Sequence, residues 1–135
     1  MRKSRNKLVT LLLLSLLFSC NAKSELGNIF ITDKNDYWQY KNDCGSHGVY
    51  FKFYDNGHYD KFNRFIDSGF ELFNNDGDLI SDKRTWSIKN DSTFIWDKGE
   101  YRIEFFNKDS VILSYTHYKE KQKKCRVTLK KVADK

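Results

Sequence analysis

The sequence contains no proline, one methionine and only three cysteines among its 135 residues. Disordered chains are often rich in proline and poor in aromatic residues, whereas Phe, Tyr and Trp make up 16% of this chain. We therefore exclude a disordered chain. The length is enough for one folded domain and too short for two.

The sequence also lacks the motifs that mark common catalytic sites. It has no Gly-x-Ser-x-Gly motif, no glycine-rich phosphate loop and no Cys-x-x-Cys pair, and its three histidines are scattered. His58 with Asp55 and Asp60 is a conceivable metal-ligand set, but such a turn is more often solvated. We predict a non-enzymatic protein with no catalytic residues, no metal and no other cofactor.

Long hydrophobic runs are absent except near the N-terminus. Residues 1–7 are basic, and residues 8–18 are almost wholly apolar. A helix of this length spans about 16 Å, whereas the hydrocarbon core of a bilayer is about 30 Å thick. A buried core helix would be amphipathic, and this run is apolar all round. The pattern is typical of a secretory signal peptide.

The apolar run ends in the sequence Leu-Phe-Ser-Cys at residues 17–20, which resembles the lipobox of bacterial lipoproteins. The resemblance implies a signal peptide over residues 1–19, cleavage between Ser19 and Cys20, and acylation of Cys20 with chains such as palmitate. Two or three acyl chains hold a protein stably on a membrane. In enteric bacteria an aspartate after the cysteine favours the inner membrane, so Asn21 implies the outer membrane of the envelope, reached through the periplasm.

The formal net charge of +6 could indicate a nucleic-acid-binding protein. Four basic residues lie in the signal peptide, and their removal lowers the basic residues from 24 to 20, against 18 acidic ones. The remaining basic run, residues 119–126, is most simply a solvated hairpin between two strands. We therefore expect no nucleic-acid partner.

Two further cysteines, Cys44 and Cys125, belong to the exported part of the chain. Disulfides persist in exported proteins, so the pair predicts one bridge that closes a loop of about 80 residues. Two free buried thiols, or a metal held by the cysteines, remain as alternatives.

Short runs of alternating apolar residues recur from residue 36 to the C-terminus, after a polar, lipidated tether at 20–35. Turns rich in Asn, Asp and Gly separate them, and Asn56-Gly57 predicts a type I′ hairpin turn. We expect strands at 37–40, 49–54, 58–66, 70–73, 84–88, 92–96, 101–106, 110–118 and 125–132. The pattern predicts an all-β domain over 36–135, an antiparallel meander closed into a barrel of about eight strands, because closure removes exposed sheet edges.

This layout resembles the lipocalin-like domains of small secreted lipoproteins, many of them from Bacteroidetes. The resemblance rests on the early tryptophan strand at Trp38, the hairpin at 51–57, the Thr-Trp-Ser-Ile strand at 85–88 and the strands at 101–103 and 111–115. It implies a lipocalin-like β-barrel that is able to hold a small apolar ligand.

If the barrel holds a ligand, large apolar side chains on the inner face would line its cavity. The candidates are Trp38, Phe51, Phe53, Trp86, Trp96 and Phe105. We therefore expect a membrane-anchored envelope lipoprotein that binds a small apolar ligand or an envelope partner. The alternative is a protein-interaction module, such as an immunity or inhibitor lipoprotein, which needs a filled interior and an exposed aromatic patch.

Overall fold

The computed structural model describes residues 24–73 and 84–134, so Ser19, Cys20 and the predicted signal peptide lie outside the described residues. In the described part, one short helix, α2 (Glu25–Phe30), precedes nine strands. The strands are β1 (Asp36–Asn42), β2 (His47–Phe53), β3 (Tyr59–Phe65), β4 (Gly69–Leu72), β5 (Trp86–Lys89), β6 (Thr93–Trp96), β7 (Gly99–Phe106), β8 (Ser110–Thr116) and β9 (Lys124–Ala133). No described helix has the length and apolarity needed to cross a membrane.

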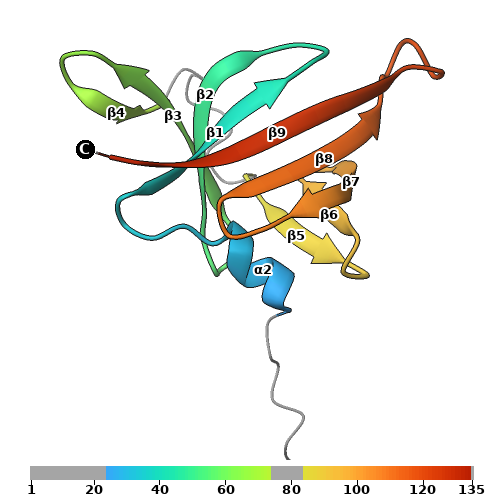
Figure 1. Cartoon of the computed structure of the whole chain (residues 1–135), viewed down its shortest axis with the longest axis horizontal. Coiled ribbons are helices and arrows are strands. Elements are labelled where there is room, and N and C mark those ends of the chain that lie inside the picture. The colour runs from blue at the N-terminus through green and yellow to red at the C-terminus, as the bar shows by residue number, and fades with distance from the viewer. Residues whose placement is uncertain (1–23, 74–83, 135) are drawn as a thin grey trace, which may run out of the picture.

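The nine strands form one antiparallel sheet that curls into an open half-barrel (Figure 1). Their order across the sheet is β4-β3-β2-β1-β9-β8-β7-β6-β5. The predicted all-β antiparallel meander is therefore confirmed. The predicted closure into a barrel is wrong, because β4 and β5 are the two edges of the sheet and do not pair with each other.

The sheet stays open because β4 pairs along β3, whereas the start of β5 meets the chain just before β3. β4 pairs with residues 62–65 of β3. Just before β3, His58 forms an isolated bridge with Thr85, and the Tyr59 N–H donates to the Arg84 carbonyl at 3.2 Å. β4 and the residues at the start of β5 thus meet different stretches of the chain. The β3–β4 hairpin extends away from the rest of the half-barrel (Figure 1).

The pairing of β1 with β9 joins the two halves of the sheet over seven residue pairs. The predicted disulfide between Cys44 and Cys125 closes beside this pairing, with Cα atoms 5.6 Å apart. Next to it, the Asp43 N–H donates to the Arg126 carbonyl at 3.0 Å, and the Arg126 N–H donates to Asp43 Oδ1 at 2.7 Å. The bridge is confirmed, and it excludes the free thiols that the sequence left open.

Residues 24–31, which the sequence analysis assigns to the tether, fold against the half-barrel. The Ser24 hydroxyl accepts a hydrogen bond from the Gly27 N–H at 3.2 Å and caps the start of α2. Leu26 and Phe30, one helical turn apart, are both buried. A six-residue helix has little stability alone, so burial of this face decides its formation.

Aromatic rings fill the space between the two halves of the sheet, and α2 contributes the central one. Phe30 is fully buried and stacks on Phe94 with ring centroids 4.4 Å apart, and it meets Phe53 edge-on at 5.9 Å. The Trp38 indole N–H donates to the Phe30 carbonyl at 2.8 Å, which gives the end of the helix a partner. α2 therefore covers the end of the half-barrel that lies lowest in Figure 1.

The segment between α2 and β1 is held by a buried lysine. Lys52 Nζ donates to the carbonyl oxygens of Asp33, at 3.5 Å, and Lys34, and it lies 4.2 Å from the centre of the Tyr37 ring. Burial lowers the pKa of the Lys52 ammonium group, while nearby carboxylates act in the opposite direction. Lys52 thus fixes the position of the segment that follows α2 relative to the sheet.

Two local details differ from the sequence prediction. The turn at Asn56-Gly57 is not type I′, because Gly57 has a positive φ of 82° and Asn56 does not. In β7, a bulge between Ile103 and Phe105 shifts the register against β8. Since neighbouring residues face opposite sides of a sheet, the extra residue turns Phe105 away from the face that holds Ile103.

We expect Phe30→Ala to lower the free energy of unfolding by about 3–5 kcal/mol, because it empties the centre of the core. Urea denaturation followed by tryptophan fluorescence measures the change. Ile66→Ala is the control, since Ile66 is fully exposed, and it should change stability by less than about 0.5 kcal/mol. Equal stability of the two variants would show that α2 does not stabilise the half-barrel.

Candidate functional site

Five of the six predicted cavity residues come together inside the half-barrel. They are Trp38, Phe51, Phe53, Trp86 and Trp96, and each is at most 9% exposed. The rings of the last four contact one another, with centroids 4.7 Å apart for Phe51 and Trp96 and 5.7 Å apart for Phe53 and Trp86. The Trp38 ring meets Phe30 at 6.4 Å. Together with Phe30 and Phe94, these residues form a packed aromatic core.

The sixth predicted residue, Phe105, lies apart from this core. It is 47% exposed because the β7 bulge turns it to the outer face, where it pairs with Ile112. Its neighbour Phe106 is 42% exposed. Other exposed apolar side chains are Phe65, Ile66, Leu72 and Tyr118. The exterior therefore carries apolar groups on several strands and hairpins.

The described histidine and cysteine clusters are occupied by internal bonds. His58 Nε2 lies 3.1 Å from Asp60 Oδ1, and the Tyr54 hydroxyl donates to Asp60 Oδ2 at 3.0 Å. Burial, followed by this bond to Asp60, raises the pKa of Tyr54 to about 12. Among the described residues, three potential metal ligands meet at Asp43, Cys44 and Cys125, where the two sulfur atoms are bonded to each other.

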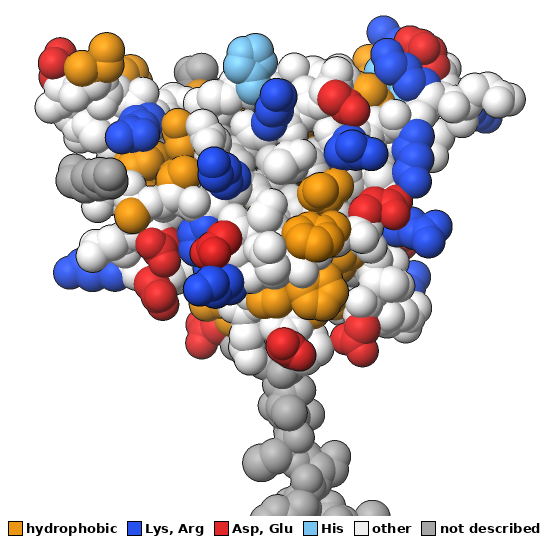
Figure 2. All heavy atoms as spheres, viewed as in Figure 1, with side chains coloured by type: hydrophobic (Ala, Val, Ile, Leu, Met, Phe, Trp, Pro, Cys, Tyr) orange, Lys and Arg blue, Asp and Glu red, His pale blue; other side chains and the backbone are white. Residues whose placement is uncertain are grey.

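Charge is unevenly distributed along the chain. Residues 98–131 contain ten Lys and Arg against four Asp and Glu, whereas residues 24–73 contain five against eight. Because residues 98–131 form β7, β8 and most of β9, the positive charge gathers on one wall of the half-barrel. Figure 2 shows many Lys and Arg side chains on the side of the β8–β9 hairpin, at the upper right.

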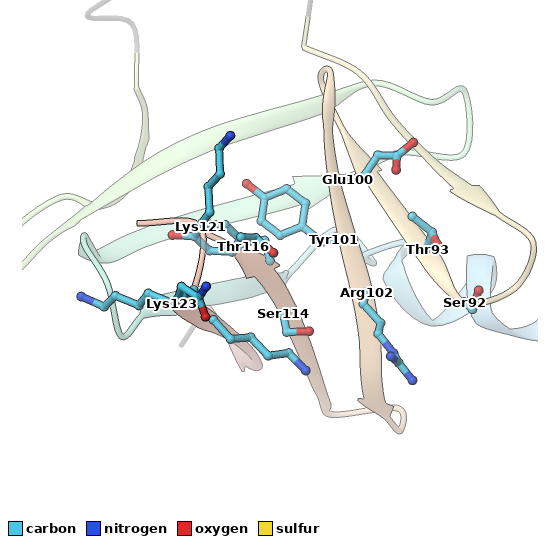
Figure 3. Close-up of a pocket in the computed structure, with 12 residues that line it drawn as sticks. Ser92, Thr93, Glu100, Tyr101, Arg102, Ser114, Thr116, Lys121 and Lys123 are labelled. Carbon is cyan, nitrogen blue, oxygen red and sulfur yellow. The ribbon is translucent and has the colours of Figure 1, made fainter. Parts of the chain in front are cut away.

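A groove of about 530 Å³ lies on this positive wall (Figure 3). We call it the polar groove. Hydroxyl groups come from Ser92, Thr93, Tyr101, Ser114, Tyr115 and Thr116. The other lining residues are Glu100, Arg102, Lys121, Gln122, Lys123 and Lys124. They come from β6, β7, β8, β9 and the β8–β9 hairpin, so the pairing of these strands builds the groove.

Tyrosine rings make a rigid part of the groove. In Figure 3, Tyr101 stands between Thr116 on one side and Thr93 on the other. Its ring meets that of Tyr115 edge-on at 5.2 Å, and the Tyr115 hydroxyl accepts a hydrogen bond from Asn42 Nδ2 at 2.9 Å. Burial raises the pKa of Tyr101 to about 12, so its hydroxyl stays neutral at physiological pH.

Glu104 organises the cationic side chains beside the groove. It accepts hydrogen bonds from Lys124 Nζ at 2.7 Å and from the buried Ser114 hydroxyl at 2.5 Å, and Arg102 Nε lies 3.9 Å away. The bonds from Lys124 and then Ser114 lower the pKa of Glu104 to about 2. Such a weak base cannot efficiently take a proton from Ser114 near neutral pH, so the cluster suits binding better than acid–base catalysis.

Sequence reasoning did not identify the polar groove. The basic run 119–126, interpreted there as a solvated hairpin, does form the β8–β9 hairpin and the start of β9, and three of its lysines also line the groove. The one feature of the sequence that could have indicated the groove was the excess of positive charge in the last third of the chain. The hydroxyl groups come from strands separated in sequence, so only strand pairing brings them to the lysines.

Glu104→Gln should lower stability at pH 7 and have a shrinking effect as the pH falls. Folding lowers the pKa of Glu104 from 4.5 to about 2. Its carboxylate therefore stabilises the fold above pH 4.5, and this contribution is lost between pH 4.5 and 2. Urea midpoints between pH 7 and 3 measure the difference from wild type.

The control for this series is Glu100→Gln, which removes a more exposed carboxylate of β7 that lies 3.6 Å from Lys89. An exposed pair of this kind contributes little to stability. A Glu104→Gln effect that stays constant over the whole pH range would contradict the role given to this carboxylate.

Comparison with known proteins adds no relative to this description. No protein-family model, no curated protein and no solved structure matches the chain.

Proposed function

We propose that this protein is a non-enzymatic lipoprotein of the bacterial envelope that binds an envelope partner on its outer surface. The lipobox resemblance at residues 17–20 supports export, cleavage after Ser19 and lipid attachment at Cys20, with the outer membrane as the destination. We infer that the half-barrel is a lipocalin-like domain whose sheet is open between β4 and β5.

The packed interior is the observation that carries this proposal. A carrier of a small apolar ligand needs an apolar cavity, of roughly 300–1,000 Å³. Here the candidate lining residues contact one another, and Phe30 from α2 occupies the centre at 0% exposure. This arrangement favours the interaction module over the carrier, as in an immunity or inhibitor lipoprotein.

The outer surface carries groups that are able to bind a partner. It carries exposed apolar side chains on three hairpins or strand ends and a groove lined by hydroxyl and cationic groups. Apolar anchors surrounded by polar groups are typical of surfaces that bind macromolecular partners. The low pKa of Glu104 and the bonded sulfur atoms of Cys44 and Cys125 favour binding over chemistry at this surface.

Native mass spectrometry of the full chain, purified from membranes in detergent, tests the binding mode. We expect a chain with its disulfide formed, two hydrogens lighter than the reduced chain, and with no apolar ligand retained inside. A co-purified apolar molecule of constant mass would overturn the proposal in favour of a carrier. Delipidated and lipidated forms compared in one spectrum separate the anchor from any bound ligand.

Cys20→Ala tests the anchor. The variant should move from the membrane fraction to the soluble fraction of exported protein, since the acyl chains are the proposed attachment. The wild-type mass should exceed that of the chain beginning at Cys20 by its acyl groups. Cys44→Ala, which removes a disulfide and no lipid, is the matched control and should stay on the membrane. Unchanged partitioning of Cys20→Ala would contradict lipid anchoring.

A further inference from the structure

The polar groove holds cationic groups that lack an acidic partner. Lys121 and Lys123 form no ion pair with any described residue. Both lysines are exposed at the rim of the groove, and in Figure 3 the Lys123 ammonium group points away from Tyr101. Arg102 and Lys124 share one carboxylate, that of Glu104. The groove and its rim therefore keep a net positive charge, which selects an anionic ligand.

The hydroxyl groups of the groove select a ligand rich in hydrogen-bonding groups. A serine or threonine hydroxyl donates one hydrogen bond and accepts others, so it matches another hydroxyl in either direction. Thr93 and Thr116 lie on opposite sides of Tyr101, and Ser114 pairs with Arg102 across β7 and β8. A ligand lying across the groove thus meets hydroxyl groups on both sides of an aromatic ring.

The size of the groove favours a short polar chain over other anionic ligands. A volume of about 530 Å³ is that of a small-molecule site, so it suits a short chain better than the surface of a folded acidic protein. Single-stranded nucleic acid needs exposed ring faces for base stacking. Here the Tyr101 ring packs against Tyr115 at 5.2 Å and Trp96 at 5.9 Å, so it is not free to act as a stacking platform.

We propose that the polar groove binds a linear acidic oligosaccharide. Sugar hydroxyls meet Thr93 and Thr116, and the carboxylate or sulfate groups of neighbouring units meet Lys121 and Lys123. A linear chain fits because Lys123 points away from Tyr101, so a sugar unit beyond the hydroxyl groups reaches its ammonium group. This inference rests on the proposed function as a surface binding module and names the ligand class for that surface.

Isothermal titration of the full chain in detergent tests the proposal with defined probes. The acidic probes are tetragalacturonate and a heparin-derived tetrasaccharide. The neutral probe is carboxyl-reduced tetragalacturonate, which has the same backbone without the charge. We expect binding of an acidic probe that weakens as salt rises, and no binding of the neutral probe.

A pair of matched double variants locates the site. Lys121→Gln/Lys123→Gln removes two rim charges and should weaken binding about tenfold. Lys108→Gln/Lys130→Gln removes two exposed charges from the same wall outside the groove, and it should change binding less than about twofold. Equal losses in both variants would show general electrostatic attraction and overturn the groove as the site.

Three further results would each overturn the proposed ligand class. Binding of neither acidic probe at millimolar concentration, equal binding of the neutral probe, or tighter groove-dependent binding of a single-stranded oligonucleotide overturns the proposal. Native mass spectrometry of the same preparation keeps the two proposals apart. If the chain holds no apolar ligand and does not bind acidic oligosaccharides, only the proposed ligand class is wrong. If the chain retains an apolar ligand, the proposed surface-binding function is wrong.

Discussion

The pairing of β1 with β9 is the contact on which the rest of this structure depends. Each half of the chain is a simple meander, and neither half encloses a core alone. Seven residue pairs between the first and last strands join the two halves, and the Cys44–Cys125 bridge fixes the end of that pairing. The inner faces of both halves then meet around Phe30. The same pairing places β9 in the wall that holds the polar groove.

A filled interior determines where function is located. In a hollow barrel, specificity is set by inward side chains and the surface is free to vary. Here Phe30 and Phe94 occupy the space that a ligand would need, so the recognition that we propose uses groups on the outer wall. The same pairing of β7, β8 and β9 that buries Val127 and Leu129 inward holds Arg102 beside Ser114 and Thr116 beside Lys124 outward.

Much of this fold is readable from sequence because strand alternation is a local property. The expected strands overlap all nine observed ones, and the expectation that an exported pair of cysteines is bonded predicted the bridge. Three features were not predictable for the same physical reason. The formation of α2, the reversal of Phe105 and the opening between β4 and β5 each depend on a partner distant in sequence. The groove belongs with them, since its lysines and hydroxyls meet only after strand pairing.

The disulfide also determines how the domain carries a mechanical load. Under the proposed lipid anchor at Cys20, a partner bound at the β8–β9 hairpin would pull the chain between Ser24 and that hairpin. The covalent path from Ser24 runs to Cys44, crosses to Cys125 and reaches the hairpin within a few residues. The chain between the two cysteines, 81 positions apart, is therefore shielded from the pull. Of the strands, β1 and the first two residues of β9 lie within this path. Because β1 is bonded to β2 and β9 on either side, it resists the force in shear, and most of the core bears no tension.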